Sequence, residues 1–205
     1  SLAWGLAIWQ FLKHMYFAIV ILFAARDLAL SPGMIGAVWM LGGVGFLIAS
    51  FWVQHANRQF GVGRVMLGGL LATGLAWLLV ALVSPGSWAA IHLGVAIFVL
   101  DLGAMLFFIN YLTLRQSVTP DHLLGRVTST MIFLSIACAP LGSLAGGAMA
   151  EIFGLRTTIG VAGAGGLLLC MLLAKFSPLS AMHELPTHTP EVPPAAASSQ
   201  ELAAE

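Results

Sequence analysis

The chain has 205 residues, of which 60% are hydrophobic and only 8% charged, and its mean hydropathy is +0.98. Soluble globular proteins carry about 25% charged residues, so this composition excludes a soluble domain and indicates a protein embedded in the lipid bilayer. The formal net charge of zero excludes the basic surface that nucleic-acid binding requires.

Six apolar stretches follow one another, and each has the roughly 20 residues that a membrane-spanning helix needs. Turn residues separate them, as at Ser31-Pro32-Gly33, and Thr119-Pro120-Asp121 is expected to start a short separate interfacial helix. The apolar runs are continuous rather than alternating, which argues against membrane-spanning strands. The predicted fold is an all-α bundle over residues 1–176, with spans at about residues 3–24, 34–53, 65–83, 88–112, 127–149 and 157–176.

Both ends of the chain differ in character from the spans. Ser1-Leu2 begins it without an initiator methionine or a basic segment, so we expect it to start part-way through a longer protein. The proline-rich residues 177–205 are predicted to be a disordered tail. Within it, His183 and His188 are spaced one residue too far apart for a zinc-binding HExxH motif, and a proline lies between them. No metal or other cofactor is predicted.

Basic residues are distributed unevenly between the two sides of the predicted bundle. Cytoplasmic loops of membrane proteins carry an excess of Lys and Arg, which places both termini in the cytoplasm. The richer side holds Arg58, Arg64, Arg115, Arg126 and Lys175, and the opposite side holds Arg26 and Arg156.

Two similar junctions indicate an internal repeat. Phe60-Gly61-Val62-Gly63-Arg64 separates the second and third spans, and Phe153-Gly154-Leu155-Arg156 separates the fifth and sixth. Because three spans lie between the two copies, they fall on opposite sides of the membrane, as in the inverted 3+3 repeats of secondary transporters. The alternative is a chance similarity, since Phe-Gly pairs are common in a glycine-rich chain.

Residues 113–156 carry a resemblance to a known family. The segment Leu114-Arg115-Gln116-Ser117-Val118-Thr119-Pro120-Asp121-His122-Leu123-Leu124-Gly125-Arg126-Val127 resembles the loop between the tenth and eleventh helices of major facilitator superfamily exporters. Ala139-Pro140-Leu141-Gly142 and Glu151-Ile152-Phe153-Gly154-Leu155-Arg156 resemble their eleventh helix and its exit. The nearest branch is the bacterial one of enterobactin exporters, macrolide efflux proteins and related secretion effectors.

The resemblance covers about residues 1–176, as helices seven to twelve of a twelve-helix inner-membrane protein. It implies a missing amino-terminal six-helix half, and export of a small amphipathic molecule, such as a drug or siderophore, by proton antiport. It also implies a cytoplasmic loop motif, although Asn57 stands where the family has an acid, so no charge relay is carried over to it. The residues assigned to that motif are Arg58, Arg64, Asp121, Gly125 and Arg126.

Two charged residues lie deep within predicted spans, where charge is costly and usually functional. Lys13 is about 16 Å from either end of its span at 1.5 Å per residue, too far for its side chain to reach the interface. Asp101 is similarly central in the fourth span. The resemblance makes these spans helices seven and ten, which line the transport cavity. Lys13 and Asp101 are therefore predicted to line it, and a purely structural ion pair between them is the alternative.

Three more residues are predicted to belong to the same substrate and proton pathway. Gln10, His14 and Phe17 are spaced with Lys13 at i, i+3, i+4 and i+7 and are expected to share one helical face. Histidine can carry a proton near neutral pH. Asn110 lies about 180° around the helix from Asp101 and is expected to face away from the cavity.

Glycines gather in the second and fifth spans and allow close helix packing. Gly42, Gly45, Gly142 and Gly146 are predicted to pack against the missing half, because helices eight and eleven have that role in the family. Packing within this bundle is the alternative.

The resulting functional hypothesis is a secondary transporter, in fragment form, and not an enzyme. A six-span membrane enzyme would need a nucleophile and base or a metal set, and a channel would need a filter or a ring of charges. Neither pattern is visible in the sequence. A half-transporter that works as a homodimer remains a further alternative.

Overall fold

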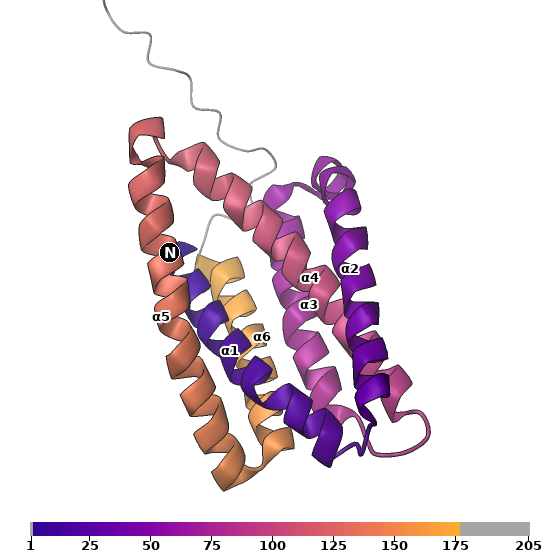
Figure 1. Ribbon diagram of the computed structural model, residues 1–205. Coiled ribbons are helices and arrows are strands. Elements are labelled where there is room, and N and C mark those ends of the chain that lie inside the picture. Colours follow the sequence, from indigo (N-terminus) through magenta and orange to yellow (C-terminus); the bar gives the residue numbers. More distant parts are fainter. Residues whose placement is uncertain (1, 177–205) are drawn as a thin grey trace, which may run out of the picture.

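The computed structural model describes residues 2–176, which form six consecutive α-helices (Figure 1). Each helix is long and apolar enough to cross a membrane, so the predicted six spans are confirmed. The predicted disordered tail and its two histidines lie outside the described residues. The helices are α1 (Leu2–Arg26), α2 (Pro32–Phe60), α3 (Val62–Leu82), α4 (Ala89–Val118), α5 (Asp121–Phe153) and α6 (Leu155–Phe176).

Helix boundaries follow from local sequence signals. Pro32 occupies the first turn of α2, and the Ser31 hydroxyl accepts a hydrogen bond of 3.4 Å from the Met34 amide. The prediction of a separate interfacial helix after Pro120 is wrong. α5 runs without a break from Asp121 to Phe153, because no residue that would end a helix follows until its apolar part is reached.

Two of the junctions between consecutive helices consist of one glycine each. Gly61 connects α2 to α3 with φ 85°, and Gly154 connects α5 to α6 with φ 87°, a region that residues with a Cβ rarely adopt. In both junctions the glycine amide donates to the carbonyl four residues earlier, at 2.9 Å and 3.0 Å. The two junctions thus have the same geometry and occupy equivalent places in the chain.

Helix packing shows the same repeat. α1 packs against α5 and α6, whereas α4 packs against α2 and α3, and α3 packs against α6. Exchanging the unit α1–α3 with the unit α4–α6 leaves this pattern unchanged. Because each unit has three spans, the second unit is inverted in the membrane, which confirms the predicted 3+3 arrangement.

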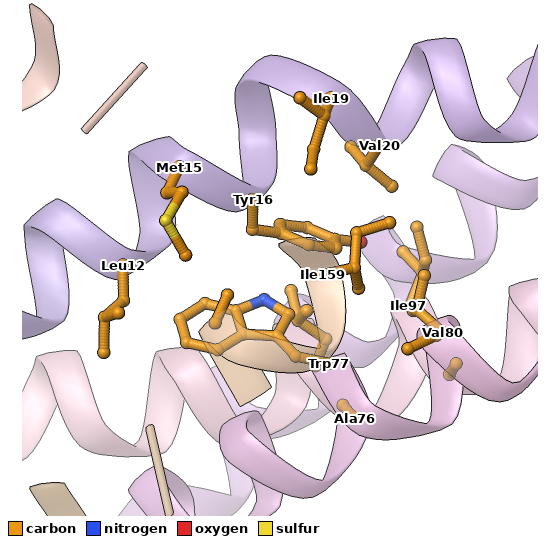
Figure 2. Close-up of a cluster of buried hydrophobic side chains, with 14 of the residues drawn as sticks. Leu12, Met15, Tyr16, Ile19, Val20, Ala76, Trp77, Val80, Ile97 and Ile159 are labelled. Carbon is orange, nitrogen blue, oxygen red and sulfur yellow. The ribbon is translucent and has the colours of Figure 1, made fainter. Parts of the chain in front are cut away.

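The core lies where α1, α3, α4 and α6 meet. Tyr16 and Trp77 are almost completely buried there, with ring centroids 5.7 Å apart, and Ile97 and Ile159 pack around them (Figure 2). α2 and α5 lie on the two flanks of the bundle (Figure 1). Only 22% of the apolar stretch of α2 and 11% of that of α5 are buried, against 56% for α3. The flanking helices therefore leave most of their apolar surface uncovered within this chain.

The side chain of Arg156 links α6 to the end of α3. Its guanidinium donates hydrogen bonds to the carbonyls of Ala81 (2.9 Å) and Val83 (2.7 Å), and it lies 5.5 Å from the ring centroid of Phe23 on α1. The carbonyls at a helix end have no partner within the helix, so this side chain supplies one and joins three helices at one end of the bundle.

We expect Arg156→Ala to destabilise the bundle by about 2–4 kcal/mol, because each hydrogen bond to a charged group contributes about 1.5–3 kcal/mol and two carbonyls lose their donor. Thermal unfolding in detergent, followed by tryptophan fluorescence, would show a lower melting temperature. Arg64→Ala is the matched control, since Arg64 is exposed at the equivalent junction of the first unit. Equal melting temperatures for the two variants would contradict this role.

Candidate functional site

A cavity of about 260 Å³ lies between α1, α2, α3 and α4, near the middle of the helices. It contains both predicted intramembrane charges, Lys13 from α1 and Asp101 from α4. Most of the remaining lining is aromatic or apolar. The lining residues are Trp9, Lys13, Phe17, Phe46, Thr73, Trp77, Leu100, Asp101, Ala104, Met105 and Phe108.

The α1 side of the cavity is a stripe of residues spaced by four. Trp9, Lys13 and Phe17 fall on one face of the helix because four residues make slightly more than one turn. The Lys13 ammonium nitrogen lies 5.1 Å from the Trp9 ring centroid and 5.9 Å from that of Phe17. The Phe17 ring in turn stacks on Trp39, at 6.1 Å and an interplanar angle of 12°. Lys13 is thus held between two aromatic rings.

Asp101 enters the cavity from α4, on the side of α4 that packs against α2. Its carboxylate lies beside Gly42, and a Cβ atom at that position would overlap it. Although Lys13 and Asp101 line the same cavity, they form no salt bridge of 4.0 Å or less. The direct ion pair considered as an alternative is therefore not formed.

Four α1 residues are predicted for the substrate and proton pathway; Gln10 and His14 are not in the lining of this cavity, and their assignment stays a prediction. Only Lys13 and Phe17 of the four reach it. Successive helical residues are about 100° apart, so His14 points away from Lys13 and lies against α5, where a Cβ added at Gly142 would be 3.1 Å from its Cβ. Residues at i+3 and i+4 share a broad helical face but not one narrow cavity.

Most of the aromatic lining is not predictable from the sequence. Phe46, Trp77 and Phe108 come from three different helices, and no local pattern connects them. Trp9 is the exception, because its spacing of four residues from Lys13 could have indicated it.

Asn110 lies away from the cavity, as predicted. It is buried, and its carbonyl oxygen accepts a hydrogen bond of 2.6 Å from the side-chain amide of Asn57 on α2. Its own amide donates to the Leu106 carbonyl at 2.9 Å. Asn57, where the family has an acid, thus links α2 to α4 through a neutral amide contact.

The four glycines assigned to packing against another bundle require a correction. Gly42 and Gly45 lie against α4, where a Cβ at Gly45 would be 2.5 Å from the Phe98 carbonyl oxygen. Gly142 and Gly146 lie against α1, where a Cβ at Gly146 would be 2.5 Å from the Met15 carbonyl oxygen. These small residues bring helices of the same chain together, so the assigned packing is wrong.

The residues of the predicted loop motif lie at one end of the bundle, where the α2–α3 and α4–α5 junctions are (Figure 1). Arg58, Arg64, Gly125 and Arg126 are exposed there. The side chain of Asp121 is not described. No contact among the motif residues tests their assigned role, which stays a prediction.

Six apolar helices in an inverted repeat, with charged groups in a cavity near the middle of the helices, are the features of one repeat bundle of a secondary transporter. The family model of the Major Facilitator Superfamily matches residues 2–202, and the chain belongs to that superfamily.

One curated relative is the "Multidrug efflux pump Tap" of Mycolicibacterium fortuitum, which is 29% identical over 127 residues. The match covers 62% of this chain and 30% of the length of that pump. No solved structure matches the chain significantly. The bacterial branch suggested by the loop between α4 and α5 stays a prediction.

Proposed function

We propose that this chain is the carboxy-terminal half of a twelve-span secondary transporter, and that the complete transporter exports a small amphipathic molecule in exchange for protons. The observation that carries this proposal is the cavity that holds Lys13 and Asp101 at mid-helix depth, since intramembrane charges typically mark substrate and ion pathways. Export as the direction is supported by the similarity to a protein named as a multidrug efflux pump.

An amino-terminal half would pack on the uncovered faces of the flanking helices. Large apolar residues are exposed on both of these helices, namely Met40 and Phe51 on α2 and Phe133, Ile136 and Leu144 on α5. Major facilitator proteins are built from two six-helix halves. The proposed arrangement places the transporter in the inner membrane with both termini in the cytoplasm, in line with the basic residues of the loops.

Asp101 is the proposed proton-binding group. It is an acidic residue in the cavity lining, and a carboxylate in a low-dielectric site changes strongly in its interactions when it gains a proton. Protonation from outside removes its charge and with it the attraction for a cationic group in the cavity. Substrate and proton therefore compete for the same side chain, which is the requirement for antiport.

We expect Asp101→Asn to abolish transport driven by a pH gradient, while exchange of substrate across the membrane at equal pH persists at substrate concentrations that offset its weaker binding. The test uses proteoliposomes containing the full-length protein encoded by the reading frame, with a fluorescent amphipathic dye as substrate. Asp27→Asn is the control, because Asp27 is an exposed carboxylate after the end of α1. Gradient-driven accumulation that survives in Asp101→Asn would contradict the coupling role.

A further inference from the structure

The ammonium group of Lys13 occupies a site that suits an organic cation. Its nitrogen is 5.1 Å from the Trp9 ring centroid and 5.9 Å from that of Phe17, within the range of about 6 Å at which a ring face attracts a cation. The Trp9 side chain is buried and packs against Phe107 at 5.2 Å, so this wall of the site is held in place.

The carboxylate that lines the same cavity makes no direct ion pair with that ammonium group, although the two charges act on each other across the cavity. Asp101 forms no salt bridge of 4.0 Å or less with Lys13. Thr73 also lines the cavity and donates its hydroxyl proton to the Gly69 carbonyl at 2.9 Å, whereas the buried indole N–H groups of Trp9 and Trp77 have no hydrogen-bond partner among the described residues. The cavity therefore offers a carboxylate and aromatic ring faces, both of which favour positive charge.

We infer that the transported molecule is a small aromatic cation, and that Lys13 is a tethered competitor that fills the cation subsite between Trp9 and Phe17 when the cavity is empty. The inference rests on the proposed function, since it names the substrate class of the same cavity. An entering cation displaces the lysine side chain from the rings and places its charge near Asp101.

An anionic substrate fits these contacts poorly. The Lys13 ammonium group, which would bind an anion, lies instead over two aromatic ring faces. The Asp101 carboxylate would repel an anion in a cavity of only about 260 Å³. A small planar cation fits because its charge and its rings meet complementary groups. The tethered ammonium then aids release, because it returns to the subsite as the substrate leaves.

Binding in detergent tests the inference without any gradient. The probe is N-methylquinolinium, with neutral quinoline and quinoline carboxylate as matched compounds of similar shape. Quenching of tryptophan fluorescence reports binding, because Trp9 and Trp77 line the cavity. The full-length protein and its variants are compared at one pH and one salt concentration.

Lys13→Met removes the competitor but keeps a long apolar side chain, so the cation is expected to bind about ten-fold more tightly. Lys13→Arg retains the charge and is expected to bind it as the unmodified protein does. Asp101→Asn is expected to weaken cation binding about ten-fold and to leave quinoline unaffected. Lys175→Met, at the exposed end of α6, is the control.

Weaker cation binding in Lys13→Met, with the melting temperature unchanged, would overturn the inference, as would a loss of quinoline carboxylate binding in that variant alone. If Lys13→Met failed to fold, Lys13→Gln would replace it with the same expected gain. Gradient-driven transport of an anion would refute the inference but keep the proposed transporter. Tight cation binding without any gradient-driven transport would refute the proposed function and keep the inference.

Discussion

Replacement of Gly42 with alanine is expected to impair transport while leaving the protein folded. The new Cβ would overlap the carboxylate of Asp101 and lie 2.8 Å from Cγ2 of the buried Ile97, so the carboxylate must leave its place in the cavity. Overpacking of this kind typically costs about 1–3 kcal/mol, and we therefore expect gradient-driven transport to fall about ten-fold or more.

The adjacent glycine supplies a matched control. Gly43 has no atom within 4 Å of its would-be Cβ, and alanine favours a helix over glycine by about 1 kcal/mol. Gly43→Ala should therefore keep both its transport rate and its melting temperature, or melt slightly higher. Transport and thermal unfolding are measured on the same preparations. Equal transport by the two alanine variants would show that the closeness of Gly42 to Asp101 has no functional consequence.

Replacement of Gly146 with alanine is expected to lower the stability of the protein strongly. Its Cβ would lie 2.5 Å from the carbonyl oxygen and 3.0 Å from the Cα of Met15, both backbone atoms of α1. A flexible side chain could move aside, but a helix backbone cannot move without separating α1 from α5. We expect a loss of about 2–3 kcal/mol, toward the upper end of usual overpacking costs.

Gly147→Ala serves as the neighbouring control, since its would-be Cβ has no atom within 4 Å. The Cβ of Gly142→Ala would overlap the carbonyl oxygen of Phe11, which lies on α1 as Met15 does. This variant is therefore expected to lower the melting temperature as Gly146→Ala does. The double variant should lose less than the sum of the two losses, because helices that have separated once relieve both overlaps. Full additivity, or a stable Gly146→Ala protein, would argue against close packing of α1 on α5.

Membrane depth explains which parts of the site were predictable. Lys13 and Asp101 could be assigned to one cavity because charge is costly in a bilayer, and depth along a span is readable from the chain. The aromatic lining of Phe46, Trp77 and Phe108 could not be assigned, because an aromatic residue is equally stable facing lipid, core or cavity. The spacing of Gln10 and His14 does not indicate how narrow the cavity face of α1 is, so the sequence alone does not show that both lie outside the lining.

The internal repeat and its packing were also predictable only in part. Gly61 and Gly154 were visible as matching junctions, since a positive φ at a one-residue turn between helices favours glycine and the neighbouring residues repeat. The partners of Gly42, Gly45, Gly142 and Gly146 were not visible. A small residue shows that a helix approaches closely at that point, but it does not identify the approaching helix.

The amino-acid sequence by itself determined the six spans, their alternation across the membrane and the depth of the buried charges. Each of these depends on the free energy of transferring residues from water to lipid, which can be evaluated for one segment of the chain without knowledge of the others. Only the tertiary structure decided which helical faces meet, that α1 packs on α5 and α2 on α4, and which side chains line the cavity. The physical reason is that lipid is as apolar as the protein core, so in a membrane hydrophobicity does not separate buried faces from exposed ones.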